Sequence, residues 1–379
     1  MKEAQPVVRL SKSCVGKEEA QALARVIDAG YLGMGREVQA FEEEIRAYLQ
    51  TEREVICVNT GTAALHLALC GLDIGPGDEV LVPTLTYVAS FQAISATGAK
   101  PVACDVTEER GFLDISDAER RLTSRTRAIM PVHYASNSVG LGAVYDFAHK
   151  HGLRVVEDAA HAFGGEYDGL KVGAGGDVVC FSFDGIKNIT SGEGGAVVTG
   201  DARLAQRIRD ARLLGVEKDT EKRYSGQRSW EFEVTHQGFR YHMSNLMAAI
   251  GREQLKKLPA FAAHRRQCVA RYIAAFNGVD GIRLLDFDHR QIVPHIFCMR
   301  VVNGKRDALL QLLRDQGIEC GVHYQPNHTL EFFRSDYPLP IAEKLAQELI
   351  SLPLHSELSE AEQTRVITAV SGLMESKRA

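Results

Sequence analysis

The chain has 379 residues, of which 45% are hydrophobic and 25% are charged, a composition typical of ordered globular proteins. This length predicts two domains, or one large domain with an appendage. The net charge is −5 and no segment is densely basic, which argues against a nucleic-acid partner.

The sequence also argues against a metal site and a membrane. Its eight cysteines are scattered singly, without the spacing of a zinc or redox motif, as expected of free thiols in a reducing cytoplasm. The N-terminus lacks the apolar core of a signal peptide. Residues 80–99 carry no formal charge, but Pro83, Gln92 and several hydroxyl groups indicate a strand and a helix rather than a membrane span. We therefore expect a soluble cytoplasmic protein.

Short apolar runs alternate with helical stretches through the first half of the chain. Strands are expected at residues 54–58, 79–82, 128–132, 155–156 and 178–183. Helices follow the first two, and another is expected near 144–151. This alternation predicts an α/β fold with a mostly parallel sheet sandwiched by helices. In such sheets ligands bind beyond the carboxyl ends of the strands.

The pattern changes after Gly251. A long amphipathic helical pattern follows, interrupted near Pro259. A strand is then expected at 295–302, a helix at 306–318 and another helix in the tail. We predict a large domain over residues 1–251 and a smaller C-terminal α+β domain over residues 252–379.

Two polar segments follow the first two predicted strands. In NTGTAA, the small residues Gly61, Thr62 and Ala63 let backbone N–H groups approach an anion at a helix N-terminus. Thr62 alone is equally typical of a helix cap. The segment has neither the dinucleotide-binding G-x-G-x-x-G nor the P-loop spacing. Tyr87, after the next strand, either fills the core or offers a flat face to a planar ring.

Two further segments follow later strands. Asp158 follows the fourth strand and His161 comes three residues later. Asp158 is either a helix cap or the acid that keeps a heterocyclic nitrogen protonated by ion pairing. The fifth strand presents Ser182, and Lys187 lies in the short connection after it, before a glycine-rich turn and another apolar strand. Most lysines are solvated surface amines, but burial between these segments would lower the pKa of Lys187 and make its amine a nucleophile for an aldehyde.

The run VEDAAHAFGGEYDGLKVGAGGDVVCFSFDGIKNITSGEGGAVV, residues 156–198, resembles the core of the sugar aminotransferases. These are pyridoxal-phosphate (PLP) enzymes of the aspartate aminotransferase fold, fold type I, that act on keto sugars. Further motifs of the family occur in order from residue 7 to 355: GYLGMGREVQAFE, NTGTAALHLAL, PTLTYVAS, GFRYHMSNLMAAIGREQL and HYQPNH.

The resemblance implies a role for each candidate residue. Lys187 would bind PLP as a Schiff base and later move the substrate proton, and Asp158 would pair with the pyridine nitrogen. The remaining cofactor contacts would come from Gly61, Thr62, Ala63, Tyr87, His161, Ser182, Arg240 and His242. His323 and Tyr324, in HYQPNH, would face the substrate.

His161 and the segment 238–245 indicate which branch of the family the chain resembles and how its subunits assemble. Many relatives carry Gln at the position of His161, whereas His resembles the branch of UDP-4-amino-4-deoxy-arabinose aminotransferase. In the family, the segment matching 238–245 reaches the phosphate of the partner subunit, which implies a homodimer with shared active sites. Many relatives have Asn in that segment, where this chain has Arg240 and His242, and Arg binds phosphate well.

The resemblance implies glutamate as amino donor and a keto sugar, by default a nucleotide-linked 4-keto sugar, as acceptor. Glutamine remains an alternative donor, and the identity of the sugar stays open. A sugar dehydratase of the same fold has histidine in place of Lys187. A non-catalytic regulatory protein would have no need of Lys187, Asp158 and Ser182 together, and a nicotinamide dehydrogenase would need the missing glycine motif.

Overall fold

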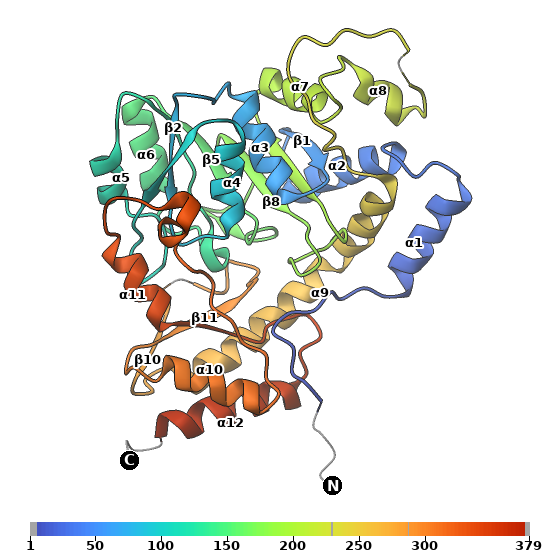
Figure 1. The fold of residues 1–379 in the computed structure, drawn as a ribbon. Coiled ribbons are helices and arrows are strands. Elements are labelled where there is room, and N and C mark those ends of the chain that lie inside the picture. Colours follow the sequence, from blue (N-terminus) through green and yellow to red (C-terminus); the bar gives the residue numbers. More distant parts are fainter. Residues whose placement is uncertain (1–5, 229, 287, 376–379) are drawn as a thin grey trace.

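The computed structural model describes residues 6–228, 230–286 and 288–375, and a seven-stranded sheet forms its centre (Figure 1). The strand order is β1-β9-β8-β5-β4-β2-β3. Its strands are β1 (Glu54–Val58), β2 (Glu79–Pro83), β3 (Lys100–Cys104), β4 (Thr126–Ile129), β5 (Arg154–Asp158), β8 (Val178–Ser182) and β9 (Gly195–Thr199). The predicted α/β fold with a mostly parallel sheet is confirmed.

Only β9 runs against the others: it pairs antiparallel with β8 and with β1, whereas the pairs from β3 to β8 are parallel. The carboxyl ends of β1, β2, β5 and β8 therefore lie at one edge of the sheet. In register, Asp158 at the end of β5 pairs with Cys180, two residues before the end of β8. The four polar segments selected from the sequence begin at this edge.

Helices cover both faces of the sheet because alternate strand residues enter different cores. Ile56 and Val58 of β1 pack in one cluster, with residues of α3, α4 and α7. Val55 and Cys57 pack in another, with α2 and α9. A third cluster joins β2, β3, β4 and β5 to α5 and α6. Strands buried on both faces explain the near-continuous apolar runs of the sequence.

The helices of this part begin and end as follows: α1 (Lys17–Asp28), α2 (Arg36–Leu49), α3 (Gly61–Gly71), α4 (Val88–Ala96), α5 (Ile115–Arg121), α6 (Leu141–His151), α7 (Ala202–Ala211) and α8 (Asp219–Tyr224). A short hairpin of β6 (Glu166–Tyr167) and β7 (Leu170–Lys171) and a 3₁₀ turn, Tyr134–Ser136, complete it.

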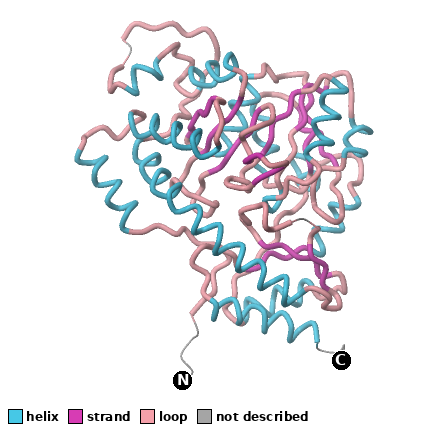
Figure 2. Tube along the Cα trace, turned by 180° about the vertical axis from the view of Figure 1, so that it is seen from behind, coloured by secondary structure: helices cyan, strands magenta, loops and turns pink. Residues whose placement is uncertain are grey.

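The C-terminal part has its own antiparallel sheet and its own core. The sheet order is β10 (Ile282–Leu284), β11 (Phe297–Val301) and β12 (Leu349–Leu352). Figure 2 shows these strands apart from the central sheet. The other elements are α10 (Arg306–Asp315), the 3₁₀ turns Asn327–Thr329 and Glu331–Phe333, α11 (Pro340–Glu348) and α12 (Glu360–Glu375). Among the helices of the described ranges, none is both long and apolar enough to span a membrane.

A single helix, α9 (Asn245–Phe276), links the two parts (Figure 1). It crosses the boundary predicted between residues 251 and 252, and that division stays a prediction. The expected interruption near Pro259 is wrong, because the helix continues through this residue. Proline removes one helical hydrogen bond, but Leu255, Leu258 and Ala262 on both sides pack into the same core. Tertiary packing therefore maintains the helix.

Gly195 lies where β9 passes closest to the turn after β1. A Cβ atom at Gly195 would lie 2.5 Å from the carbonyl oxygen of Thr60 and 2.8 Å from that of Phe181. Because backbone lies on both sides, neither neighbour can rotate away. We predict that Gly195→Ala lowers the free energy of unfolding by about 1–3 kcal/mol, as overpacking does elsewhere, measured by denaturant titration.

The matched control is Gly372→Ala in α12, where the added Cβ would meet no atom within 4 Å. This change is expected to leave stability unchanged or to raise it by about 0.5–1 kcal/mol. Equal effects of the two substitutions would contradict the prediction.

Candidate active site

Lys187 lies in the connection between β8 and β9. Its backbone N–H donates to the carbonyl of Asp184 (3.0 Å), and its Nζ is 3.5 Å from Nε2 of His295. Removal from water lowers the pKa of Lys187, while the carboxylates of Asp158 and Asp184 oppose this shift. The protein thus makes the neutral, nucleophilic amine more available than in a surface lysine.

Asp158 is buried at the carboxyl end of β5. Its Oδ2 accepts a hydrogen bond from Ser90 Oγ (2.6 Å), and its Oδ1 accepts one from the backbone N–H of Ala160 (3.2 Å). Ser90 is itself 2.9 Å from the hydroxyl of Thr86. These donors replace the hydrogen bonds to water that the buried carboxyl group loses, and they fix its direction towards the cavity.

The N-terminus of α3 forms an anion-binding end of the cavity. Thr60 is its N-cap and accepts the N–H of Ala63 (3.0 Å), so Ala63 contributes to the cap and does not line the cavity. Gly61 and Thr62 do line it, beside Ser182. A Cβ at Gly61 would lie 2.7 Å from Cβ of Ser182, which explains why glycine is needed there.

Aromatic and imidazole side chains form the opposite wall. Tyr87, the N-cap of α4, is 61% exposed, and its ring centroid lies 5.8 Å from that of Tyr324. Tyr324 OH is 3.0 Å from Nε2 of His161. Burial lowers the pKa of His161 well below its ordinary value and that of His323 to about 4, and nearby Lys187 acts in the same direction. Both imidazoles are therefore neutral.

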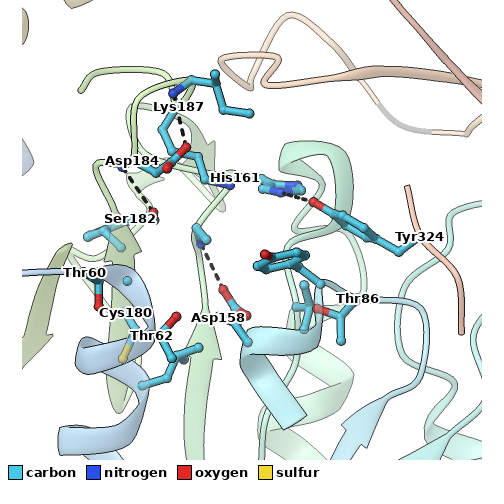
Figure 3. Close-up of a pocket in the computed structure, with 18 of the residues that line it drawn as sticks. Thr60, Thr62, Thr86, Asp158, His161, Cys180, Ser182, Asp184, Lys187 and Tyr324 are labelled. Carbon is cyan, nitrogen blue, oxygen red and sulfur yellow. Dashed lines mark hydrogen bonds between the residues drawn. The ribbon is translucent and has the colours of Figure 1, made fainter. Parts of the chain in front are cut away.

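These groups enclose a single cavity of about 420 Å³ (Figure 3). The volume lies within the usual range for small-ligand sites. Among the described residues that line it, Lys187 is the only lysine or arginine, whereas three carboxylates are present: Asp158, Asp184 and Glu193.

Arg240 and His242 lie outside this cavity. Arg240 is exposed and its backbone bridges Leu213, while His242 bridges Val58 at the end of β1. Burial, followed by the charge of Arg240, lowers the pKa of His242 to about 4. Within one chain, the structure therefore brings together Gly61, Thr62, Tyr87, Asp158, His161, Ser182, Lys187, His323 and Tyr324, but not Ala63, Arg240 or His242.

Sequence reasoning missed Ser90 and His295. Ser90 lies within PTLTYVAS, in the first turn of α4 just after Tyr87, so a hydroxyl in the first helical turn after the second strand is the signal that could have indicated it. His295 contacts a lysine 108 residues earlier in the chain, and no local pattern indicates such a contact.

The residues of the cavity fit PLP by their chemistry. A nucleophilic amine, a buried carboxylate and a helix N-terminus match the aldehyde, the pyridine nitrogen and the phosphate of the cofactor. The geometry and the fold together define a PLP-dependent enzyme of the aspartate aminotransferase type.

Comparisons with known proteins agree. Residues 13–371 match the DegT/DnrJ/EryC1/StrS aminotransferase family, and the chain belongs to this family of PLP-dependent sugar aminotransferases. DesV from S. venezuelae is 38% identical, with a TM-score of 0.87 and 95% of each chain covered. Helicobacter pylori PseC, an aminotransferase of pseudoaminic acid biosynthesis, is 28% identical, with a TM-score of 0.90 over 98% of this chain and 100% of PseC.

A sugar aminotransferase from Streptococcus pneumoniae, solved in a PLP-form and a PMP-form, is also similar. The two forms are 27% and 28% identical to this chain, each with a TM-score of 0.90, covering 97% of this chain and 99% and 98% of theirs.

The hydrogen bond from Ser90 to Asp158 has a measurable consequence. We predict that Ser90→Ala lowers the rate of amino transfer about tenfold, because a buried carboxylate loses a charge-assisted hydrogen bond and its fixed direction. The measurement is single-turnover kinetics of the PLP-loaded enzyme.

The control is Ser95→Ala on the same helix, since Ser95 is half-buried and lies outside the cavity lining. It is expected to react at the wild-type rate. A Ser90→Ala enzyme as fast as this control would show that Ser90 does not orient Asp158.

Proposed function

We propose that the chain transfers an amino group from glutamate to a nucleotide-linked 4-keto sugar, acting as a cytoplasmic homodimer. The observation that carries the proposal is the amine of Lys187 lining one cavity with the buried carboxylate of Asp158. Membership of the sugar aminotransferase family supports transamination of a sugar. The donor, the nucleotide and position C4 rest on the resemblance and on His161.

Bound PLP supplies an electron sink for the pair of electrons left when the substrate carbon loses its proton. The chain's own residues do the rest. Lys187 would hold the cofactor covalently and, when its amine is free, would take the substrate proton at Nζ. Asp158 would keep the pyridine nitrogen protonated by its charge. Gly61, Thr62 and Ser182 would hold the phosphate, and Tyr87 would lie against the ring.

The substrate side of the cavity is assigned to His323 and Tyr324. Tyr324 is fixed by its hydrogen bond with His161, so its ring can orient a sugar without reorganisation. Nε2 of His161 is shared with Tyr324, and Nδ1 of His323 is shared with Ser351 (2.7 Å). The other ring nitrogen of each neutral imidazole can form one hydrogen bond to a hydroxyl group. A dehydratase of this fold would have histidine in place of Lys187, which disfavours that alternative.

Two features of the single chain support a dimer: a cavity that is short of positive charge and an exposed apolar segment next to Arg240. The cavity lining has three carboxylates and one cation, whereas PLP, glutamate and a nucleotide sugar are all anionic. Arg240 is exposed on a segment that follows exposed apolar side chains: Trp230 at 87%, Phe232 at 56% and Val234 at 51%. Apolar groups gathered on one exposed segment are typical of protein interfaces. We propose that Arg240 binds the phosphate in the partner's cavity.

The eight cysteines are all free thiols, which supports the proposed cytoplasmic location because disulfides are rare in reducing compartments.

The function is tested by supplying PLP-loaded protein with glutamate and a panel of nucleotide-linked 4-keto sugars. We predict that 2-oxoglutarate and one amino sugar form in equal amounts, as quantified by mass spectrometry. Reaction with glutamine but not glutamate would contradict the assignment of glutamate as donor. Amination at another carbon would contradict the assignment of a 4-keto sugar as acceptor.

In the same preparation, borohydride reduction is expected to leave the cofactor attached to Lys187, located by peptide mapping. Lys187→Arg should abolish attachment, while Lys256→Arg, at an exposed lysine of α9, should not change it. An adduct on another lysine contradicts the role of Lys187.

The shared active site is tested by mixing two inactive homodimers, Lys187→Ala and Arg240→Ala. If Arg240 acts across the dimer, one site of each heterodimer combines an intact Lys187 with an intact Arg240. Activity is then predicted to return to as much as half the wild-type value per heterodimer. If Arg240 acts within its own chain, every site carries a lesion and no activity returns, although native mass spectrometry shows that heterodimers have formed.

A further inference from the structure

His295 lies in the C-terminal part, two residues before β11, yet it reaches Lys187. It is buried, and its Nε2 lies 3.5 Å from Nζ of Lys187. Its ring centroid is 4.4 Å from that of His161, so one imidazole packs against the other beside the amine. Within the described part of the chain, Lys187 forms hydrogen bonds with two residues: its backbone N–H donates to the carbonyl of Asp184, and its Nζ lies within reach of His295.

The backbone around His295 is held from two sides. Its N–H donates to Ser136 Oγ (3.1 Å), and the same hydroxyl donates to the carbonyl of Val293 (2.9 Å). From the other side, Arg265 of α9 donates to the carbonyls of Pro294 (3.3 Å) and His295 (3.2 Å). Arg265 is fully buried, and burial lowers its pKa to about 10.

Burying a guanidinium that binds only carbonyl and hydroxyl groups of the described residues is unfavourable, because the charge loses its water and gains no counter-charge from them. The arrangement keeps His295 within reach of Lys187. Burial, with a further contribution from the charge of Lys187, lowers the pKa of His295 well below its ordinary value, so the imidazole is neutral.

A neutral imidazole beside Nζ favours the protonated form of Lys187. An ammonium group has no lone pair, so protonated Lys187 can only donate, and Nε2 of His295 can accept. Hydrogen bonds to a charged donor are stronger than those between neutral groups. The contact therefore stabilises Lys187 when it carries a proton and points Nζ in one direction when it does not.

We propose that His295 is a positioning residue for Lys187, which accepts a hydrogen bond from Nζ whenever the lysine is not bonded to the cofactor. The part of this role that concerns proton transfer from the substrate rests on the proposed function. When the proton of the substrate carbon moves to Nζ, the amine becomes an ammonium held by His295. Release of that proton from Nζ restores the amine, while His295 itself gains and loses no proton.

The test uses full-length protein freed of cofactor, and its main readout needs neither donor nor sugar. PLP is added, and absorbance follows its attachment to Lys187, in which the C–N bond forms and water leaves. We predict that His295→Leu slows attachment about tenfold or more, because the lost direction of Nζ outweighs the larger share of neutral amine that remains when the acceptor is removed. His295→Gln, whose amide oxygen can accept the same hydrogen bond, is expected to stay within about threefold of wild type.

His355→Leu is the matched control, because His355 is another buried histidine of the C-terminal part, and its Nδ1 accepts the backbone N–H of Glu357 (3.3 Å) instead of contacting Lys187. It is expected to change the melting temperature but not the attachment rate. If the Leu variant of His295 does not fold, His295→Asn replaces it, since its amide is too short to reach Nζ. Equal losses in the Leu and Gln variants, or a wild-type rate in the Leu variant, overturn the proposal.

A second readout separates this proposal from the proposed donor. With glutamate deuterated at the α-carbon, the isotope effect on the first half-reaction is expected to be larger in His295→Leu than in wild type, because proton transfer to Nζ becomes slower. A wild-type enzyme that does not respond to glutamate refutes the donor, while the attachment rates still decide the role of His295.

Discussion

The structure around the cavity depends on the burial of a carboxylate and an amine at the ends of two neighbouring strands. Asp158 ends β5, and Lys187 follows β8, which pairs with β5 in parallel. Burying a carboxylate is unfavourable unless donors replace the lost water, and here Ser90 and the N–H of Ala160 do so. Ser90 lies in the first turn of α4, so its hydrogen bond to Asp158 ties the start of this helix to the end of β5.

Much of this arrangement could be predicted from local sequence patterns. Apolar runs identified most strands of the sheet, and residues at or near the ends of those strands, such as Thr62, Asp158 and Ser182, line the cavity. The reason is topological, because parallel strands bring their carboxyl ends to one edge. The edge strand β3 was missed because Lys100 and Pro101 interrupt its apolar pattern, although proline is tolerated at a sheet edge.

Other features depend on contacts between distant parts of the chain. The continuity of α9 through Pro259 comes from packing on both sides of the proline, which an isolated helical pattern does not contain. His295 meets Lys187 because Ser136 and Arg265 hold its loop. Arg240 was assigned to a phosphate by resemblance, and it lies outside the cavity of its own chain. A single sequence carries no direct sign of which subunit such a residue serves.

The unbalanced charge of the cavity has a consequence for how anionic molecules arrive. With carboxylates at Asp158, Asp184 and Glu193 against the single cation Lys187, and with a net charge of −5 on the whole chain, there is little long-range attraction to draw an anion inward. Electrostatic steering speeds association when a site and its ligand have opposite charges. One chain alone therefore offers an anion little steering, and a cation brought by the proposed partner subunit would supply an attraction that weakens as salt concentration rises.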